Sequence, residues 1–228
     1  MRLDRFICKS TSLLREEARA LISAGGVRVN AQIASDEAMQ VHENNCITVD
    51  GQQLTARASR YIMMHKPRGT ICSNVDEGYP SLFNAIDVDS VGELHVAGRL
   101  DADTTGLVLL TDDGRWSFNI ITPEKRCEKV YRVALRDPVA DDLVVRFHRG
   151  LQLQGEKVLT QPAKLQTVGE KEVLLTITEG KYHQVKRMFA AVGNRVVALH
   201  RQKIGELSLD LGIGQWRHLT AEEVNSFE

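Results

Sequence analysis

The polar segment at residues 98–107, GRLDADTTGL, is the feature that most constrains how this chain folds. Apolar residues of strand composition flank it on both sides, so we expect it to be a connection held between two strands. A glycine near each end permits a tight backbone path and the close approach of a ligand to the chain. Its two aspartates, Asp101 and Asp103, fit two interpretations: an Asp-rich turn that caps its own backbone, or a site with a carboxylate nucleophile or base.

The same segment also fits D-x-D-x-T, a phosphoryl-transfer signature that resembles haloacid-dehalogenase-like phosphatases. In such a protein the first aspartate would end a buried, almost continuously apolar parallel strand. Here Asp101 follows His95, Gly98 and Arg99 instead, and the next acidic pair, 112–113, comes almost at once before a glycine. This spacing predicts a turn at 112–114 and disfavours the phosphatase interpretation.

Length and composition predict a folded protein of one large or two small domains. The chain has 228 residues, of which 43% are apolar, enough for a substantial core. It contains no apolar run of eighteen residues and opens with charged residues, so we expect a cytoplasmic protein without membrane contact. Its four cysteines are widely separated and form no C-x-x-C, which predicts neither disulfides nor a metal site.

Charge is unevenly distributed along the chain. A net charge of −1 would disfavour binding to a polyanion if it were uniform. Residues 181–203, however, contain six lysines and arginines and no acid, and residues 1–30 contain six basic residues against three acids. Two basic patches would suit a nucleic acid that spans both, although two ordinary solvated faces would give the same pattern.

Residues 1–56 predict a small α/β module. An apolar stripe at Leu3, Phe6 and Ile7 indicates one helix, and Ser12 is a candidate cap for a second helix that ends at 25–26. Short strands are expected at 27–29 and 47–49. The R-L-D-x-x-I opening and G-x-V-x-V-N resemble the S4 RNA-binding domain. The resemblance implies RNA contacts at Arg2, Arg5, Arg15, Arg19, Arg28 and Asn30.

Residues 57–60 lack large apolar side chains and are expected to link this module to a second domain at 61–228. Strand-like segments dominate that domain, at 61–64, 94–96, 107–110, 130–135, 173–177 and 207–209. Helices are expected at 115–121, 139–148 and 181–192. The pattern predicts an α+β fold built on a mostly antiparallel sheet.

Three further motifs of this domain carry polar side chains. K-P-R-G at 66–69 reads as a basic turn, E-K-V-Y at 128–131 puts Tyr131 on a strand, and G-K-Y-H-Q-V-K-R at 180–187 enters an amphipathic helix. Together with 98–107, these motifs resemble those of the pseudouridine synthases that act on ribosomal RNA, in the same order. The resemblance implies that Asp101 is catalytic, that Tyr131 packs on the target base, and that Lys186 pairs with Asp101. It further implies substrate contacts at Lys66, Arg68, Arg99, Thr104, Thr105, Lys181, Gln184, Arg187, Leu199 and Arg201.

The implied reaction is the isomerisation of one flipped-out uridine in 16S rRNA, expected to be uridine 516, to pseudouridine. It needs no metal, nucleotide or redox cofactor. The expected partner is small-subunit rRNA or its ribonucleoprotein assembly intermediate, and the protein is expected to be a monomer. One alternative is a related synthase for 23S rRNA. Another is a non-catalytic S4-type assembly factor, and the intact Asp101, Tyr131 and Lys186 argue against this second alternative. None of the seven histidines has a sequence partner that indicates a site.

Overall fold

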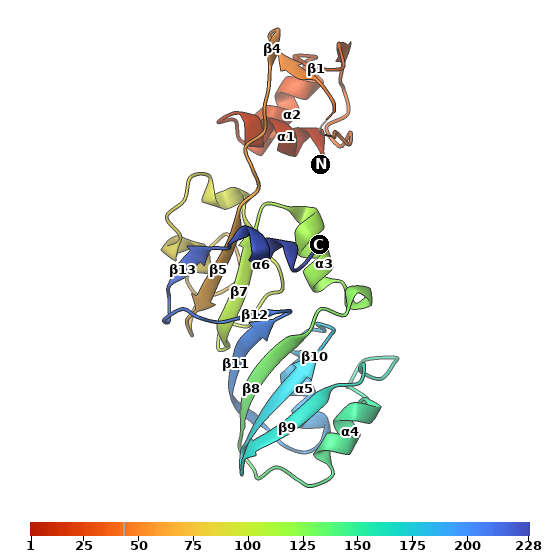
Figure 1. The fold of residues 1–228 in the computed structure, drawn as a ribbon, viewed down its shortest axis with the longest axis vertical. Helices are drawn as coiled ribbons and strands as arrows, with labels where there is room; N and C mark the ends of the chain where they lie inside the picture. Colours follow the sequence, from red (N-terminus) through yellow and green to blue (C-terminus); the bar gives the residue numbers. More distant parts are fainter. Residues whose placement is uncertain (43) are drawn as a thin grey trace. The chain divides into compact units, whose positions relative to one another are not determined.

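The computed structural model describes residues 1–42 and 44–228, and it divides the chain into two compact units, Met1–Ala58 and Ser59–Glu228 (Figure 1). The expected linker at 57–60 spans this division. None of the helices in the described residues combines the length and apolar content needed to cross a bilayer.

The N-terminal unit packs two helices, α1 (Leu3–Ser10) and α2 (Arg15–Ser23), with a small antiparallel sheet. The sheet has the order β2-β1-β3-β4, with bounds Gln32–Ile33, Val27–Val29, Ile47–Val49 and Gln52–Gln53. Its core consists of the buried apolar faces of these elements, including Leu3, Ile7, Ala18, Ile22, Val27 and Ile47. The expected helical stripe therefore forms the core of this unit.

The start of α2 differs from expectation. Leu14, and not Ser12, occupies the N-cap position, because the helix begins at Arg15. The backbone N–H of Leu14 donates to Glu17 Oε2 at 2.7 Å, so a side chain inside the first turn satisfies the helix end.

The C-terminal unit contains a nine-stranded sheet along which the strands run in the order β13-β5-β7-β11-β8-β10-β9, with β6 beside β7 and β12 beside β11. In chain order the strands are β5 (Tyr61–Lys66), β6 (His95–Val96), β7 (Thr105–Thr111), β8 (Lys129–Leu135), β9 (Lys164–Gly169), β10 (Glu172–Ile177), β11 (Val196–Ile204), β12 (Leu207–Ser208) and β13 (Trp216–His218). The pair β7 and β11 is parallel and the other pairs are antiparallel. The predicted mostly antiparallel α+β fold is confirmed.

Strands β5 and β7 are buried on both faces, which explains their nearly continuous apolar sequences. Val108 and Leu110 enter a core that also receives the buried sides of α4 (Leu143–Arg149) and α5 (Gln184–Ala191). Leu107 and Leu109 enter a second core, which receives side chains of α3 (Gly114–Ile121) and α6 (Ala221–Asn225). The sheet is thus fixed from both sides where the polar segment 98–107 enters it.

Two local expectations are corrected in this unit. Residues 112–114 do not form a simple turn, because the Asp113 carboxylate accepts the backbone N–H groups of Arg115 and Trp116 and caps α3. The helices expected at 139–148 and 181–192 begin later, at Leu143 and Gln184. Short 3-10 turns also occur, at Leu82–Ala85, Val91–Glu93 and Pro123–Lys125.

Candidate active site

The segment 98–107 lies between β6 and β7, and two buried cations hold it there. Lys66, at the end of β5, is completely buried, and its ammonium donates to the carbonyl oxygens of Pro67 at 3.2 Å and Thr104 at 2.9 Å. Burial lowers the pKa of Lys66. Contrary to expectation, this ammonium is occupied inside the protein and is not presented to RNA.

Arg201, on β11, is the second buried cation and is only 2% exposed. Its Nη2 donates to Gly98 O at 2.7 Å, its Nε donates to Leu107 O at 2.8 Å, and its Nη1 donates to Tyr131 Oη at 3.3 Å. One guanidinium therefore ties both ends of the polar segment to β11 and also contacts Tyr131 on β8. It lines the cavity described below, but most of its donors are used within the protein.

Gly106 is required by the packing of two strands and not by a ligand. Its φ is +115°, and a Cβ at this position would lie 2.2 Å from the carbonyl oxygen of Arg201 on the parallel neighbour β11. The close approach expected at this glycine is thus an approach of protein backbone.

Asp101 is the centre of a compact charge cluster. The Lys186 ammonium, from the first turn of α5, lies 2.8 Å from Asp101 Oδ2 and 2.6 Å from Asp103 Oδ1. Burial lowers the pKa of Lys186, but the hydrogen bonds to Asp101 and Asp103 outweigh burial and raise it overall. Burial raises the pKa of Asp103, and the hydrogen bond from Lys186 reverses this and lowers it. Lys186 therefore stays charged between two anions, in the pairing that the family resemblance implied.

His183 also contacts Asp101, with Nε2 3.4 Å from Oδ1, and the sequence analysis missed it. The residue is the N-cap of α5 and has a left-handed backbone with φ +48°. This conformation turns the ring toward the aspartate, and nothing in the sequence signals it.

Asp101 faces a cavity of about 680 Å³ within the C-terminal unit. Its side chain is 29% exposed, so the carboxylate is accessible while Lys66 and Arg201 behind it are not. The residues expected at the site that line this cavity are Arg99, Asp101, Thr104, Tyr131, Lys181, Gln184, Lys186, Leu199 and Arg201. Four other expected residues do not line it: Lys66, Arg68, Thr105 and Arg187.

Tyr131 and Leu199 supply apolar walls, each 8% exposed, from the neighbouring strands β8 and β11. Gln184 is buried and has a positioning role, since its Oε1 accepts the backbone N–H of Lys181 at 2.8 Å and its Nε2 donates to Glu179 Oε1 at 2.7 Å. These bonds fix the turn that precedes α5. The cavity thus combines an accessible carboxylate with a flat aromatic wall.

Several other expected contact residues have partners inside the protein. Lys181 and Arg187 both pair with Glu156 at 3.1 Å, and their hydrogen bonds lower the pKa of that carboxyl. The Thr105 hydroxyl lies 2.8 Å from His200 Nδ1, away from the cavity lining. Thr104 lines the cavity although it is almost fully buried, and Arg68 and Arg99 are exposed.

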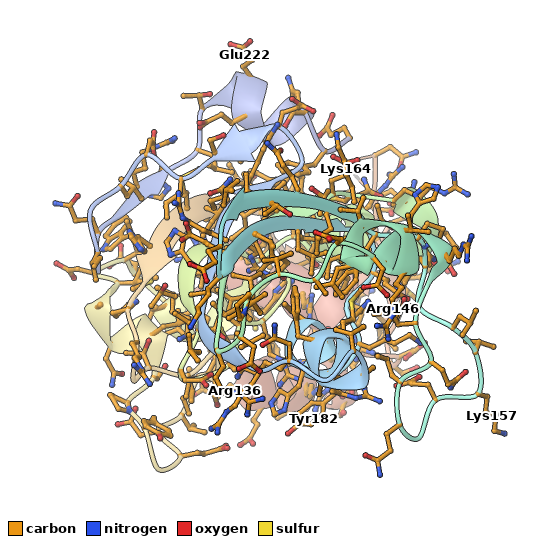
Figure 2. All side chains as sticks on the ribbon, turned by 90° about the horizontal axis from the view of Figure 1, so that it is seen from below. Arg136, Arg146, Lys157, Lys164, Tyr182 and Glu222 are labelled. Carbon is orange, nitrogen blue, oxygen red and sulfur yellow. The ribbon has the colours of Figure 1, made fainter. Side chains whose placement is uncertain are left out.

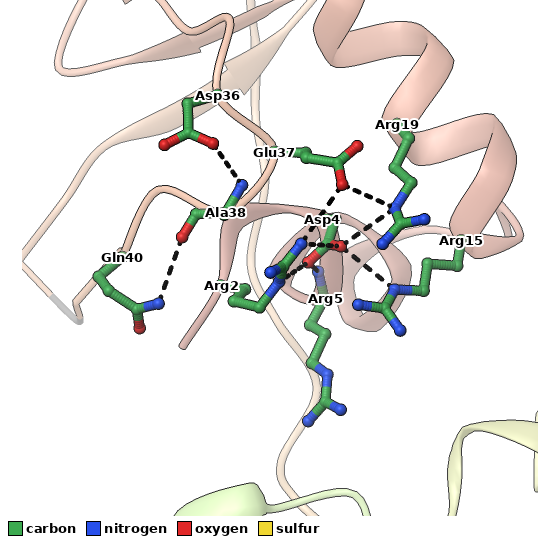
Figure 3. A network of polar contacts seen from close by, with 9 residues as sticks. All are labelled: Arg2, Asp4, Arg5, Arg15, Arg19, Asp36, Glu37, Ala38 and Gln40. Atoms are coloured by element: carbon green, nitrogen blue, oxygen red, sulfur yellow. Dashed lines mark hydrogen bonds and ion pairs between the residues drawn. The ribbon is translucent and has the colours of Figure 1, made fainter.

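Three arginines of the N-terminal unit, Arg2, Arg15 and Arg19, gather around one buried carboxylate (Figure 3). The Asp4 side chain is 0% exposed and accepts two hydrogen bonds from Arg2, at 3.0 and 2.9 Å, one from Arg15 at 3.2 Å and one from Arg19 at 3.4 Å. Arg2 and Arg19 also contact Glu37. Burial raises the pKa of Asp4, but the hydrogen bonds from Arg2 and Arg15 outweigh it and lower the pKa to about 2.

The side chains of the remaining expected RNA contacts of this unit lie outside that network, although the backbone N–H of Arg5 donates to Asp4 Oδ1 at 2.8 Å. Arg5 is exposed, with its guanidinium directed away from Asp4 in Figure 3. Arg28 donates to Ala31 O at 3.1 Å and is exposed. Asn30, with φ +50°, uses its side-chain oxygen to accept the Cys46 N–H at 2.9 Å. Its amide oxygen therefore supports a turn.

Comparison with known proteins identifies both units. Residues 60–191 match the RNA pseudouridylate synthase family, and residues 1–47 match the S4 domain. The chain belongs to the RNA pseudouridylate synthase family. It is 49% identical over 228 residues to the ribosomal small subunit pseudouridine synthase A of Vibrio cholerae, covering 99% of both chains. The enzyme of that name from Escherichia coli is 47% identical, again with 99% of both chains covered.

A solved pseudouridylate synthase structure matches the whole chain, with a TM-score of 0.74, 45% identity and full coverage of both chains. The expected family, the two-part fold and the assignment of the protein as an isomerase are thereby confirmed.

Proposed function

We propose that this synthase converts one uridine of small-subunit ribosomal RNA, expected to be uridine 516 of 16S rRNA, to pseudouridine. The relatives that share nearly the full length of the chain are named as ribosomal small subunit enzymes, which supports this substrate class. The observation that carries the proposal is the accessible Asp101 carboxylate, held by Lys186 at 2.8 Å and facing a cavity large enough to admit a base.

In the reaction, the N-glycosidic bond of uridine breaks, the uracil rotates, and a C-glycosidic bond forms. Asp101 would act on the ribose or base as a nucleophile, or on the sugar as a base, and both routes use an accessible anion. Lys186 fixes the orientation of this carboxylate. Tyr131 supplies the aromatic face against which an extruded uracil stacks, with Leu199 as a second apolar wall.

The N-terminal unit would contribute affinity and placement. Three of its arginines meet at Asp4, and the two on α2, Arg15 and Arg19, contact that carboxylate through Nε while their side chains remain 48% and 39% exposed (Figure 3). Arginine forks of this kind suit phosphate groups. We propose that this face binds structured rRNA, free or in an assembling particle, and that the protein acts as a monomer in the cytoplasm.

The decisive test compares Asp101→Asn with Asp103→Asn. Both carboxylates contact Lys186, but only Asp101 lines the cavity. We expect Asp101→Asn to abolish pseudouridine formation in small-subunit rRNA while binding persists, and Asp103→Asn to retain most of the turnover. Substantial turnover by the Asp101 variant would refute its catalytic role.

A synthase for large-subunit rRNA would share the catalytic residues of this cavity. Mapping pseudouridines in both ribosomal RNAs from cells that lack the protein separates the two substrates. Loss of a 23S site with the 16S site intact would refute the proposed substrate. The non-catalytic alternative predicts no loss at any site.

A further inference from the structure

An exposed aromatic side chain stands at the cavity, and neither the proposed chemistry nor the fold accounts for it. Tyr182 is 76% exposed, more than any other large apolar or aromatic side chain in the described part of the chain. It is labelled among the outer side chains of Figure 2, and it lines the same cavity as Asp101. A tyrosine in this position is not used to fill a core.

Tyr182 stacks on His183, with ring centroids 3.7 Å apart and ring planes 24° from parallel. His183 in turn reaches Asp101 with Nε2 at 3.4 Å from Oδ1. The two rings therefore form a layered arrangement that begins at the candidate catalytic carboxylate and ends at an exposed aromatic face.

The turn that carries this pair is fixed from several sides. The carbonyl oxygen of Tyr182 accepts a hydrogen bond from Arg187 Nη1 at 3.0 Å, and the Gln184 side chain accepts the preceding backbone N–H. The left-handed conformation of His183, with φ +48°, costs free energy that the surroundings must offset, and such conformations concentrate at functional sites. A rigid aromatic face loses little conformational entropy when it binds a flat ligand.

We propose that Tyr182, supported by His183, is a stacking platform for the base of a nucleotide adjacent to the target uridine. The inference rests on the proposed function. Flipping a uridine out of an RNA strand leaves its neighbours without a stacking partner, and RNA-binding proteins commonly stack unpaired bases on aromatic side chains. The walls formed by Tyr131 and Leu199 would take the uracil, and the exposed face of Tyr182 would take its neighbour. Tyr182 acts on binding and positioning of the RNA, not on the reacting bonds.

The test uses full-length Tyr182→Ala, Tyr182→Phe and Tyr182→Trp with a fragment of small-subunit rRNA that contains the target uridine. We expect Tyr182→Ala to raise KM roughly 5- to 100-fold, the effect of removing one base stack, with kcat changed by less than about threefold. Tyr182→Phe and Tyr182→Trp keep an aromatic face, so their KM should stay near the wild-type value. Phe118→Ala is the matched control, because Phe118 is a 53% exposed aromatic residue that does not line the cavity.

A spectroscopic readout separates stacking from other effects. The measurement uses the Asp101→Asn background, which prevents turnover, and RNAs that carry 2-aminopurine at one of the two positions beside the target uridine. The fluorescence of 2-aminopurine should be quenched on binding at one of these positions. Adding Tyr182→Ala should remove that quenching. An unchanged KM for Tyr182→Ala, a KM for Tyr182→Phe as high as that of Tyr182→Ala, or equal quenching with and without Tyr182 would overturn the platform. Wild-type protein that binds this RNA but never converts it would refute the proposed function instead, and the binding and quenching measurements would still test the platform.

Discussion

Replacing the buried carboxylate of the N-terminal unit, Asp4→Asn, should destabilise that unit without altering the catalytic unit. The arginine contacts lower the pKa of Asp4 from 3.8 to about 2. Each pKa unit corresponds to about 1.4 kcal/mol, so the ionised carboxylate stabilises the folded unit by about 2 kcal/mol at neutral pH. The amide retains one acceptor oxygen but no charge, and it leaves Arg2, Arg15 and Arg19 to repel one another.

Hydrogen exchange followed by mass spectrometry on the full chain measures this loss directly. Amides of α1 and α2 should exchange roughly 30-fold faster in Asp4→Asn at pH 7, which is the rate equivalent of about 2 kcal/mol. Amides in Ser59–Glu228 serve as an internal reference. Asp36→Asn is the matched control, because that carboxylate is exposed and, among the described residues, its hydrogen bond is to the nearby Ala38 N–H at 2.8 Å.

The pH dependence gives the same prediction a second test. Since the folded pKa of Asp4 is depressed, its contribution is fully present above 3.8 and is lost as the pH falls through about 2. The stability difference between wild type and Asp4→Asn should therefore shrink as the pH falls from about 3.8 to about 2. An exchange difference below threefold at pH 7, or one that does not change in acid, would show that solvent screens these arginines and that the network does not stabilise the unit.

The remaining predictions concern the catalytic unit and RNA binding. Lys186→Met should lower kcat by about 100-fold, because the carboxylates 2.8 and 2.6 Å from the ammonium lose their positioning partner. Lys186→Arg should retain most of the activity, and equal kcat values for the two variants would contradict this role of the charge. Gly106→Ala should lower the melting temperature, with a loss of at least about 2 kcal/mol, because its Cβ would meet Arg201 O at 2.2 Å, while Gly69→Ala, with no atom within 4 Å, should cost less. Deleting residues 1–58 should weaken rRNA binding and make it less dependent on salt. The slope of log K against log salt concentration should fall by about 0.9 or less for each phosphate that the unit neutralises, and an unchanged slope would show that the unit does not bind phosphate.

The sequence predicted strands where burial alone determines the pattern. Strands β5 and β7 are apolar throughout because both of their faces are covered, so composition was sufficient to find them. Strand β9 was missed because four of its six residues are exposed and it pairs only at the edge of the sheet. Strand β11 was missed as a whole for a different reason, since its second half is polar in sequence although Arg201 within it is buried.

The sequence alone does not show which distant residues lie together in the candidate site, and the family resemblance supplied that information. Asp101 and Lys186 are 85 positions apart, and their pairing followed from the resemblance alone. Composition could not show that Lys66 and Arg201 are buried, because a basic residue in a loop motif looks the same whether it binds phosphate or backbone carbonyls. His183 was missed because its contact with Asp101 depends on a left-handed backbone angle, which a histidine in a sequence does not indicate.

The buried cations and the accessible carboxylate differ in exposure, and we propose from this difference which group meets the substrate. Lys66 and Arg201 donate to carbonyl oxygens at both ends and in the middle of the segment that carries Asp101, and both are removed from solvent. A buried charge without partners would be costly, so these donors are committed to holding the backbone. Asp101 is held from one side by Lys186 and still exposes 29% of its side chain. A group that must form or assist a bond to RNA has to remain reachable, and we propose that Asp101 is this group because it is accessible and lines the same cavity as Tyr131.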